Sequence, residues 1–238
     1  MTIVPESKLF ALPARRCRSP AHGGFLRGWK RESVETSCPW TMASSTDYDD
    51  EGRKLMASLT AAAASSSNLY NPMDAIWKDE ATGGTVFVGN VTAAQEAKKR
   101  GITHVVNCTD DMANFCEGAG VKYLRFNVAY WQAAGDSRKY HPATQSEIMQ
   151  FVQTVFDFVD AALRGGGQVL VHCLAGAHRA GTTGCLLIMY KTGMGQQEAI
   201  RTAKKLRGII NPIGGLPELL RTYEAGRAKG SAKTCAAS

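Results

Sequence analysis

The most informative part of the chain reads Val169-Leu170-Val171-His172-Cys173-Leu174-Ala175-Gly176-Ala177-His178-Arg179-Ala180-Gly181. Residues 168–171 form a short and nearly all-apolar run, which is typical of a strand at the centre of a sheet that is covered on both faces. Small residues follow, and residues 181–190 have the composition of a buried helix. The pattern therefore predicts a buried strand that passes through a tight loop directly into a helix.

A loop between a strand and the start of a helix is suited to hold an anion, because the helix end presents unpaired N–H groups and a partial positive charge. Small residues at 175–177 let the backbone amides close around a phosphate. Cys173 begins the loop, where the same amides favour its thiolate form. Arg179 follows six positions later, so its guanidinium returns to the mouth of the loop and can bind two phosphate oxygens. The predicted phosphate cradle consists of Leu174, Ala175, Gly176, Ala177, His178 and Arg179.

Strands and helices alternate on both sides of this loop. Strands are expected at 85–89, 102–107, 121–128 and 168–171 from their β-branched and apolar composition. Helices are expected at 92–101, after Pro142 as far as Gly165, and at 181–190, 196–207 and 217–225. The first of these begins with Thr92-Ala93-Ala94-Gln95, which has the spacing of a capping box. The alternation predicts an α/β fold with a central, mostly parallel sheet flanked by helices.

The composition of the chain changes near residue 70. Residues 1–70 contain an Arg-bearing opening, an acidic patch and a run of small residues, without sustained apolar periodicity. We expect this region to be largely disordered, or to act as an organelle-targeting peptide. Residues 71–228 are the predicted catalytic domain, and residues 229–238 are expected to be a flexible tail.

Charge and cysteine content exclude several classes of protein. Residues 71–238 carry 19 Lys and Arg against 14 Asp and Glu, which suits an anionic substrate, and no basic block interleaved with aromatics suggests nucleic-acid binding. No apolar run approaches the roughly 18 residues of a membrane-spanning helix. The seven cysteines are odd in number and lack a Cys-x-x-Cys pair, which argues against a disulfide framework or a zinc site. A reducing compartment, cytoplasmic or nuclear, is the simplest expectation, with organelle import as the alternative.

The segment His172 to Arg179 resembles the HCxxGxxR signature of the protein tyrosine phosphatase superfamily, and its surroundings are similar to the dual-specificity phosphatases. The resemblance extends over residues 74–226 and includes the segments 85–107 and 207–220. It implies that Cys173 attacks phosphorus to form a cysteinyl-phosphate, and that Arg179 and the loop amides stabilise the phosphate oxygens. It implies no metal or other cofactor, a phosphoprotein substrate and, we expect, a monomeric protein.

The sequence offers several candidates for the general acid that the resemblance implies. The family carries an Asp on a loop about thirty residues before the Cys, and the matching position here falls near Tyr130 or Trp131. Asp136, a carboxylate in the loop that follows, is the predicted acid, and its alternative is a surface role. Asp110 and Asp111, at the end of the neighbouring strand, are the fallback candidates.

Two further positions carry expectations. Ala180 stands where most family members have Ser or Thr, which predicts slow hydrolysis of the cysteinyl-phosphate. Cys108 ends a strand expected to lie beside the one that feeds Cys173, and parallel strands end at the same edge of a sheet. Cys108 is therefore either a redox partner of Cys173 or a buried thiol without function.

Three classes of function fit these residues. The first is a phosphatase acting on phosphotyrosine, phosphoserine and phosphothreonine in proteins. The second is a phosphatase for a glucan or another non-protein substrate, and the third is a pseudophosphatase that binds phosphorylated ligands without turnover.

Overall fold

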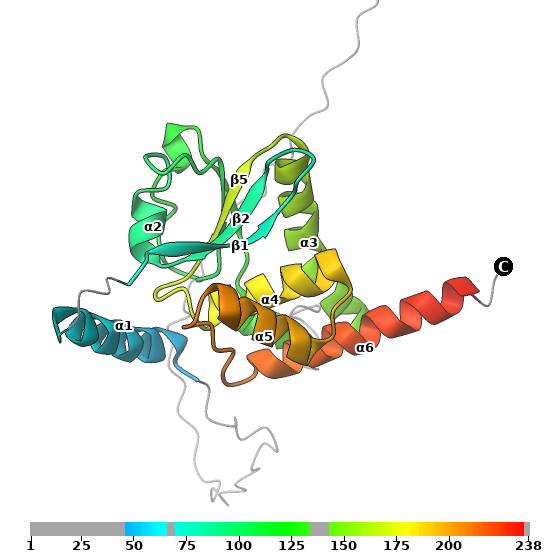
Figure 1. The fold of residues 1–238 in the computed structure, drawn as a ribbon. Helices are drawn as coiled ribbons and strands as arrows, with labels where there is room; N and C mark the ends of the chain where they lie inside the picture. The colour runs from blue at the N-terminus through cyan, green and yellow to red at the C-terminus, as the bar shows by residue number, and fades with distance from the viewer. Residues whose placement is uncertain (1–45, 66–69, 134–142, 236–238) are drawn as a thin grey trace, which may run out of the picture. The chain divides into compact units, whose positions relative to one another are not determined.

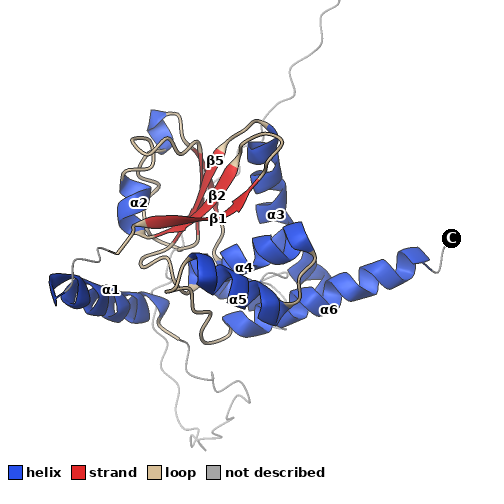
Figure 2. Ribbon diagram, viewed as in Figure 1, coloured by secondary structure: helices blue, strands red, loops and turns tan. Residues whose placement is uncertain are grey.

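A computed structural model describes residues 46–65, 70–133 and 143–235 of the chain. Five strands form one sheet in the order β1-β2-β5-β3-β4. Figures 1 and 2 show the neighbouring strands β1, β2 and β5 with helices on both sides of them. The strands are β1 (Met73–Lys78), β2 (Thr85–Gly89), β3 (His104–Asn107), β4 (Lys122–Arg125) and β5 (Gln168–His172). β1 pairs antiparallel with β2, and every other pairing is parallel. The predicted α/β fold with a mostly parallel sheet is therefore confirmed.

Helices cover both faces of the sheet and extend beyond it. They are α1 (Tyr48–Ser65), α2 (Val91–Gln95), α3 (Gln145–Arg164), α4 (Arg179–Thr192), α5 (Gln196–Leu206) and α6 (Leu216–Cys235), with short 3-10 helices η1 (Glu117–Ala119) and η2 (Val128–Ala133). Within the described ranges, none of them combines the length and apolar character needed to cross a bilayer.

The position of β5 at the centre of the sheet explains why most of its residues are apolar. Val169 and Val171 are fully buried in the larger core, which α3, α4 and α6 share with one face of the sheet. Leu170 points to the opposite face and is buried in a smaller cluster beneath α2. Because Val169, Leu170 and Val171 each meet a covered face, apolar and polar residues do not alternate along this part of the strand.

Helix α3 follows the predicted pattern and is capped at its start. Thr144 accepts a hydrogen bond from the N–H of Glu147, and the Glu147 carboxylate accepts one from the N–H of Thr144 at 2.7 Å. The buried face of the helix consists of Ile148, Val152, Val155, Phe156, Val159, Ala162 and Leu163. Phe151 and Phe158 are partly buried and pack against the same core.

The structure differs from the sequence predictions at three helices. Helix α2 runs from Val91 to Gln95 rather than over the expected 92–101, and its cap is Asn90, whose side chain accepts from the N–H of Ala93. Helix α1 lies within the region expected to be disordered, and α6 continues past residue 228, where a tail was expected. The partly buried Leu and Met residues of α1 are Leu55, Met56 and Leu59, a stripe of little more than one turn, which is too short for hydrophobic periodicity to reveal the helix.

The cap of α3 gives a test of the fold. Replacement of Thr144 by Ala removes the acceptor for the Glu147 N–H and should lower the free energy of unfolding by about 1 kcal/mol. Urea denaturation measures this change, with Ser146→Ala, an exposed substitution in the same turn, as the control. Equal stabilities of the two variants would contradict the role of the cap.

Candidate active site

The predicted loop lies at the carboxyl edge of the sheet. β2 and β3 flank β5 in parallel register, so Gly89 and Asn107 lie beside His172, the last residue of β5. The chain then passes through residues 173–178 and enters α4 at Arg179. The predicted strand–loop–helix unit is thus confirmed, and the C-terminal ends of three parallel strands meet beside the loop.

Four successive carbonyl groups of the loop are held by donors that lie outside it. Because the C=O and N–H of a trans peptide point in opposite directions, this arrangement turns the N–H groups of the following residues toward the inside of the loop. N–H groups that point inward can donate hydrogen bonds to the oxygens of an anion bound in the loop. The donor–acceptor pairs are Val91 N–H with Leu174 O (3.0 Å), Tyr70 O–H with Ala175 O (2.6 Å), Arg207 Nε with Gly176 O (3.0 Å) and Asn211 N–H with Ala177 O (3.0 Å).

Arg207 is the principal support of the loop from behind. Its side chain is 1% exposed and forms an ion pair with Asp74 at 2.5 Å. It also contacts the hydroxyl of Tyr70, and its guanidinium carbon lies 5.0 Å from the centre of the Tyr70 ring. The sequence analysis did not identify either residue as functional, although Arg207 begins the segment that resembles the end of the family domain.

Gly176 allows the loop to approach strand β2. Its φ is +69°, and a Cβ at this position would lie 2.4 Å from the carbonyl oxygen of Gly89. The left-handed backbone and the close contact both exclude a side chain. The glycine of the signature is therefore required by packing as well as by the turn.

Cys173 and Arg179 are brought together at the loop. Cys173 is 3% exposed, and the Arg179 side chain is 4% exposed. Burial by itself lowers the pKa of Arg179, but the nearby Cys173 sulfur and the Asp49 carboxylate act in the opposite direction and raise it above its usual value. The guanidinium therefore stays charged next to the sulfur, as binding of an anion requires.

A carboxylate from α1 engages the same guanidinium. Nη1 of Arg179 donates to Oδ2 of Asp49 at 3.4 Å, and Nη2 forms a closer ion pair with Oδ1. Nε of Arg179 is buried and has no hydrogen-bond partner among the described residues. Asp49 thus takes up two donors of the group that the sequence assigned to phosphate.

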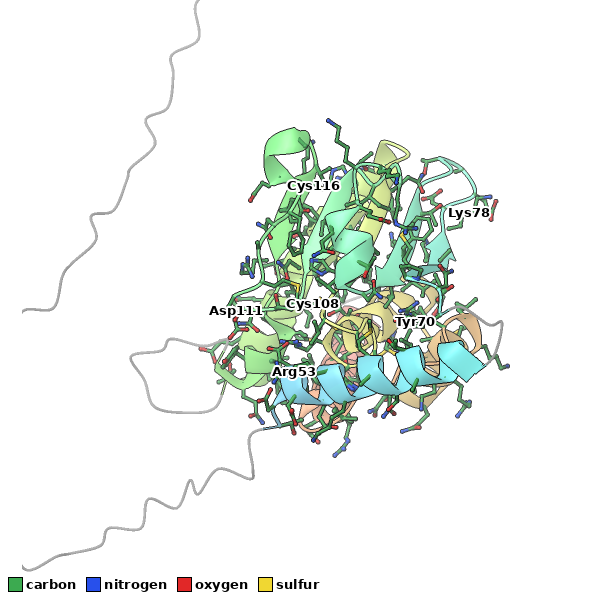
Figure 3. The ribbon with its side chains drawn as sticks, turned by 90° about the vertical axis from the view of Figure 1, so that its left-hand side faces the viewer. Arg53, Tyr70, Lys78, Cys108, Asp111 and Cys116 are labelled. Atoms are coloured by element: carbon green, nitrogen blue, oxygen red, sulfur yellow. The ribbon has the colours of Figure 1, made fainter. Side chains whose placement is uncertain are left out.

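Helix α1 is fixed across the loop by contacts on both sides of Asp49. The Asp47 carboxylate accepts from the N–H of Asp50 at 2.9 Å and so caps the helix. Gly52 is buried against Leu174, which lies 3.3 Å from the position that a Cβ of Gly52 would take. Figure 3 shows α1 running below the sheet edge at which Asp111, Cys108 and Tyr70 are labelled. This contact joins residues far apart along the chain and was not predicted from the sequence.

Asp110 and Asp111 also lie at the mouth of the loop. One oxygen from each of Asp49, Asp110 and Asp111 lies within 4.8 Å of the others. Carboxylate oxygens so close together are suitable ligands for a divalent cation, but Asp110 and Asp111 are exposed and Asp49 is already paired with Arg179.

Tyr130 occupies the position where the resemblance places the family's acid. Its ring is 58% exposed, and its hydroxyl donates to Oδ2 of Asp110 at 3.3 Å. Trp131, the adjacent candidate, is buried in the core. Asp136, the predicted acid, lies outside the described residues, and that assignment stays a prediction.

The histidines at the two ends of the loop, His172 and His178, are both buried. Nδ1 of His178 lies 2.7 Å from the carbonyl oxygen of Asn211, so the ring is tied to the backbone. His172 is completely buried near the backbone of Cys173, and burial lowers its pKa to about 4. A proton-transfer role for His172 near neutral pH has no support from this environment.

Cys108 lies next to the loop but is inaccessible. Its N–H donates to the carbonyl of His172 at 2.9 Å, and its sulfur lies 3.4 Å from the hydroxyl of Thr183. Burial raises the pKa of Cys108 to about 12, which leaves little of the reactive thiolate. Its pairing with Cys173 stays a prediction.

The threonines that follow Ala180 do not replace the missing hydroxyl. The Thr182 hydroxyl donates to the carbonyl of His178 at 2.7 Å, and the Thr183 hydroxyl donates to that of Arg179 at 3.1 Å. Both groups therefore serve the first turn of α4.

The Asp49 contact yields a binding prediction. In Asp49→Asn the amide lacks the negative charge that competes for Arg179, so inorganic phosphate should bind more tightly. A partly exposed ion pair contributes about 1 kcal/mol, which corresponds to about fivefold in affinity. Isothermal titration calorimetry measures the change.

The matched control is Asp50→Asn on the same helical turn, where the carboxylate pairs with Lys54 at 2.8 Å and does not contact Arg179. Its phosphate affinity should equal that of the unmodified chain. An Asp49→Asn variant that binds phosphate no better than this control would refute the competition.

The burial of His172 predicts a pH dependence of stability. Its pKa in the folded chain, about 4, is below the ordinary 6.5, so the unfolded chain binds the proton first as the pH falls. The contribution of the neutral ring is complete above about pH 6.5 and is lost as the pH decreases toward about 4. Between about pH 7 and pH 5 the free energy of unfolding should decrease by about 2 kcal/mol.

Urea denaturation at both pH values measures this decrease. The variant His172→Gln should show much less of it, whereas His104→Gln should keep most of it. An unchanged pH dependence in His172→Gln would show that other groups are responsible.

Comparison with known proteins agrees with this geometry. A family model described as the dual specificity phosphatase catalytic domain matches residues 86–225. The mouse serine/threonine/tyrosine-interacting protein is 30% identical over 146 residues, which are 59% of this chain and 61% of that protein. The rat dual specificity protein phosphatase 15 is 26% identical over 141 residues, covering 58% of this chain and 54% of that protein. The match thus spans less than two thirds of each relative.

Solved structures share the fold. A mouse putative dual specificity phosphatase, solved with zinc tungstate, has a TM-score of 0.52 and 24% identity, covering 70% of this chain and 95% of that structure. Human DUSP28 has a TM-score of 0.51 and 21% identity, covering 67% of this chain and 97% of that structure. Because the family model covers more than half of the sequence, the chain belongs to the dual-specificity phosphatase family of the protein tyrosine phosphatase superfamily.

Proposed function

We propose that the chain is an active cysteine-dependent phosphatase that hydrolyses phosphotyrosine, phosphoserine and phosphothreonine in proteins. The observation that carries the proposal is the loop in which four outward carbonyls leave the amides facing inward around Cys173 and Arg179. The family supplies a protein phosphatase domain. What we propose beyond the family is that the domain of this chain is catalytically active and that its substrates are phosphorylated proteins.

In the proposed reaction the thiolate of Cys173 attacks phosphorus, and the bond from phosphorus to the ester oxygen breaks. The inward amides and the Arg179 guanidinium stabilise the negative charge on the other phosphate oxygens. Water then attacks the cysteinyl-phosphate, and the sulfur leaves as a thiolate. Ala180 supplies no hydroxyl for this second step, and the Thr182 and Thr183 hydroxyls are directed to backbone carbonyls, which supports the prediction that the second step is slow.

Binding without turnover is the second candidate. It is favoured by the Asp49 carboxylate on Arg179 and by the similarity to the mouse serine/threonine/tyrosine-interacting protein, whose name describes an interacting protein. Turnover of a glucan or another non-protein phosphate is a third outcome of the same measurements.

Asp49 lies before residue 71, so the proposed functional unit begins earlier than the domain expected from sequence.

An aryl phosphate assay with the full chain tests the proposal. Cys173→Ser should lose turnover by at least about 10³-fold, because the nucleophile is gone. Arg179→Lys should lose about 10²-fold, because an ammonium does not reproduce the two-pronged contact with phosphate. Cys116→Ser is the matched control, since Cys116 is partly exposed and its sulfur faces carbonyls near α2.

Absence of Cys173-dependent release, combined with tight binding of a phosphopeptide, would reject the enzyme in favour of the binding protein. Faster release from phosphorylated amylopectin than from phosphopeptides would reject the protein substrate.

A further inference from the structure

We propose that Asp110 is the general acid of this phosphatase and that the Tyr130 hydroxyl holds its carboxyl group in position. The inference rests on the proposed function and deepens it. It assigns the proton donor to the loop after β3 rather than to the segment that follows β4.

The Asp49 carboxylate marks where the substrate phosphate would lie. Its two oxygens face the two terminal nitrogens of Arg179, as two oxygens of a bound phosphate would. A carboxylate oxygen of Asp110 lies within 4.8 Å of a carboxylate oxygen of Asp49. This separation can be bridged by one water molecule or closed by a side-chain rotation, and catalytic contacts commonly tighten only when the substrate binds.

Two contacts fix Asp110 at this place. The Tyr130 hydroxyl donates to its Oδ2 at 3.3 Å. From the other side, Nη1 of Arg125 donates to the carbonyl oxygens of Thr109 at 2.8 Å and of Asp110 at 3.0 Å. The neighbouring Asp111 carboxylate accepts no hydrogen bond within the described residues. Geometry therefore favours Asp110 over Asp111.

The Tyr130 hydroxyl keeps its proton and therefore remains a donor to Asp110. The Asp110 charge is the largest cause of the raised pKa of Tyr130, so the phenol stays neutral at neutral pH.

The proton then moves as follows. While the Cys173 sulfur forms its bond to phosphorus, the ester oxygen leaves and takes the proton from the Asp110 carboxyl group. The products of this step are a free alcohol, the cysteinyl-phosphate and the Asp110 carboxylate. In the second step the Asp110 carboxylate accepts a proton from the attacking water, and the bond from phosphorus to sulfur breaks. Inorganic phosphate is released, and the Cys173 thiolate and the Asp110 carboxyl group are regenerated.

Leaving-group dependence tests the assignment, because only a poor leaving group needs the proton. With the full chain, Asp110→Asn should lower kcat for phenyl phosphate by about 10²-fold and should affect dinitrophenyl phosphate far less. Asp111→Asn is the matched comparison, because it removes the same charge from the same place, and it should cause no selective loss on phenyl phosphate. Retained turnover of dinitrophenyl phosphate also shows that the Asp110→Asn chain is folded.

Equal losses on the two substrates, or a selective loss in Asp111→Asn or Asp136→Asn instead, would overturn the assignment. If the unmodified chain shows no Cys173-dependent turnover of dinitrophenyl phosphate, the proposed function itself fails. The two failures are therefore distinguishable.

Tyr130→Phe tests the positioning role separately. The ring stays, and only the donor to Asp110 is removed. We expect a selective loss of about five- to tenfold on phenyl phosphate, equivalent to about 1 kcal/mol for one hydrogen bond, with little change on dinitrophenyl phosphate. Unchanged rates on both substrates would show that the hydroxyl does not position the acid.

Discussion

The hydrogen bonds that Arg207 and Tyr70 make to the carbonyls of Ala175 and Gly176 determine what the loop can do. They turn the peptide groups so that N–H donors line the interior, beside a sulfur and a guanidinium. The buried ion pair of Arg207 with Asp74 holds the guanidinium in turn. An uncompensated charge at this depth would be costly, so the pair and the loop are interdependent.

Much of this arrangement could be predicted from sequence because it is local. The apolar strand, the small residues of the loop and the spacing from Cys173 to Arg179 lie within a dozen positions of one another, and their chemistry follows from neighbours along the chain. Helix α3 was predictable for a similar reason, since its apolar positions repeat with the helical period.

The rest of the site depends on contacts between distant residues. Arg179 meets Asp49 across 130 positions, and Arg207 meets Asp74 across 133. No periodicity or spacing rule connects such pairs. Helix α1 was attributed to a disordered segment because its apolar stripe is short, yet Asp47 caps it and Gly52 packs on Leu174. Likewise, only the fold brings the Tyr130 hydroxyl to Asp110.

The pairing of Asp49 with Arg179 has a consequence for the susceptibility of the Cys173 sulfur to oxidation. A thiolate that is nucleophilic enough for catalysis is also readily oxidised, and its higher oxidation states are irreversible. With α1 in place, Cys173 is 3% exposed, so the contact that competes for Arg179 also limits the access of oxidants to the sulfur. In the proposed reaction, a bound substrate would cover the same sulfur in its turn.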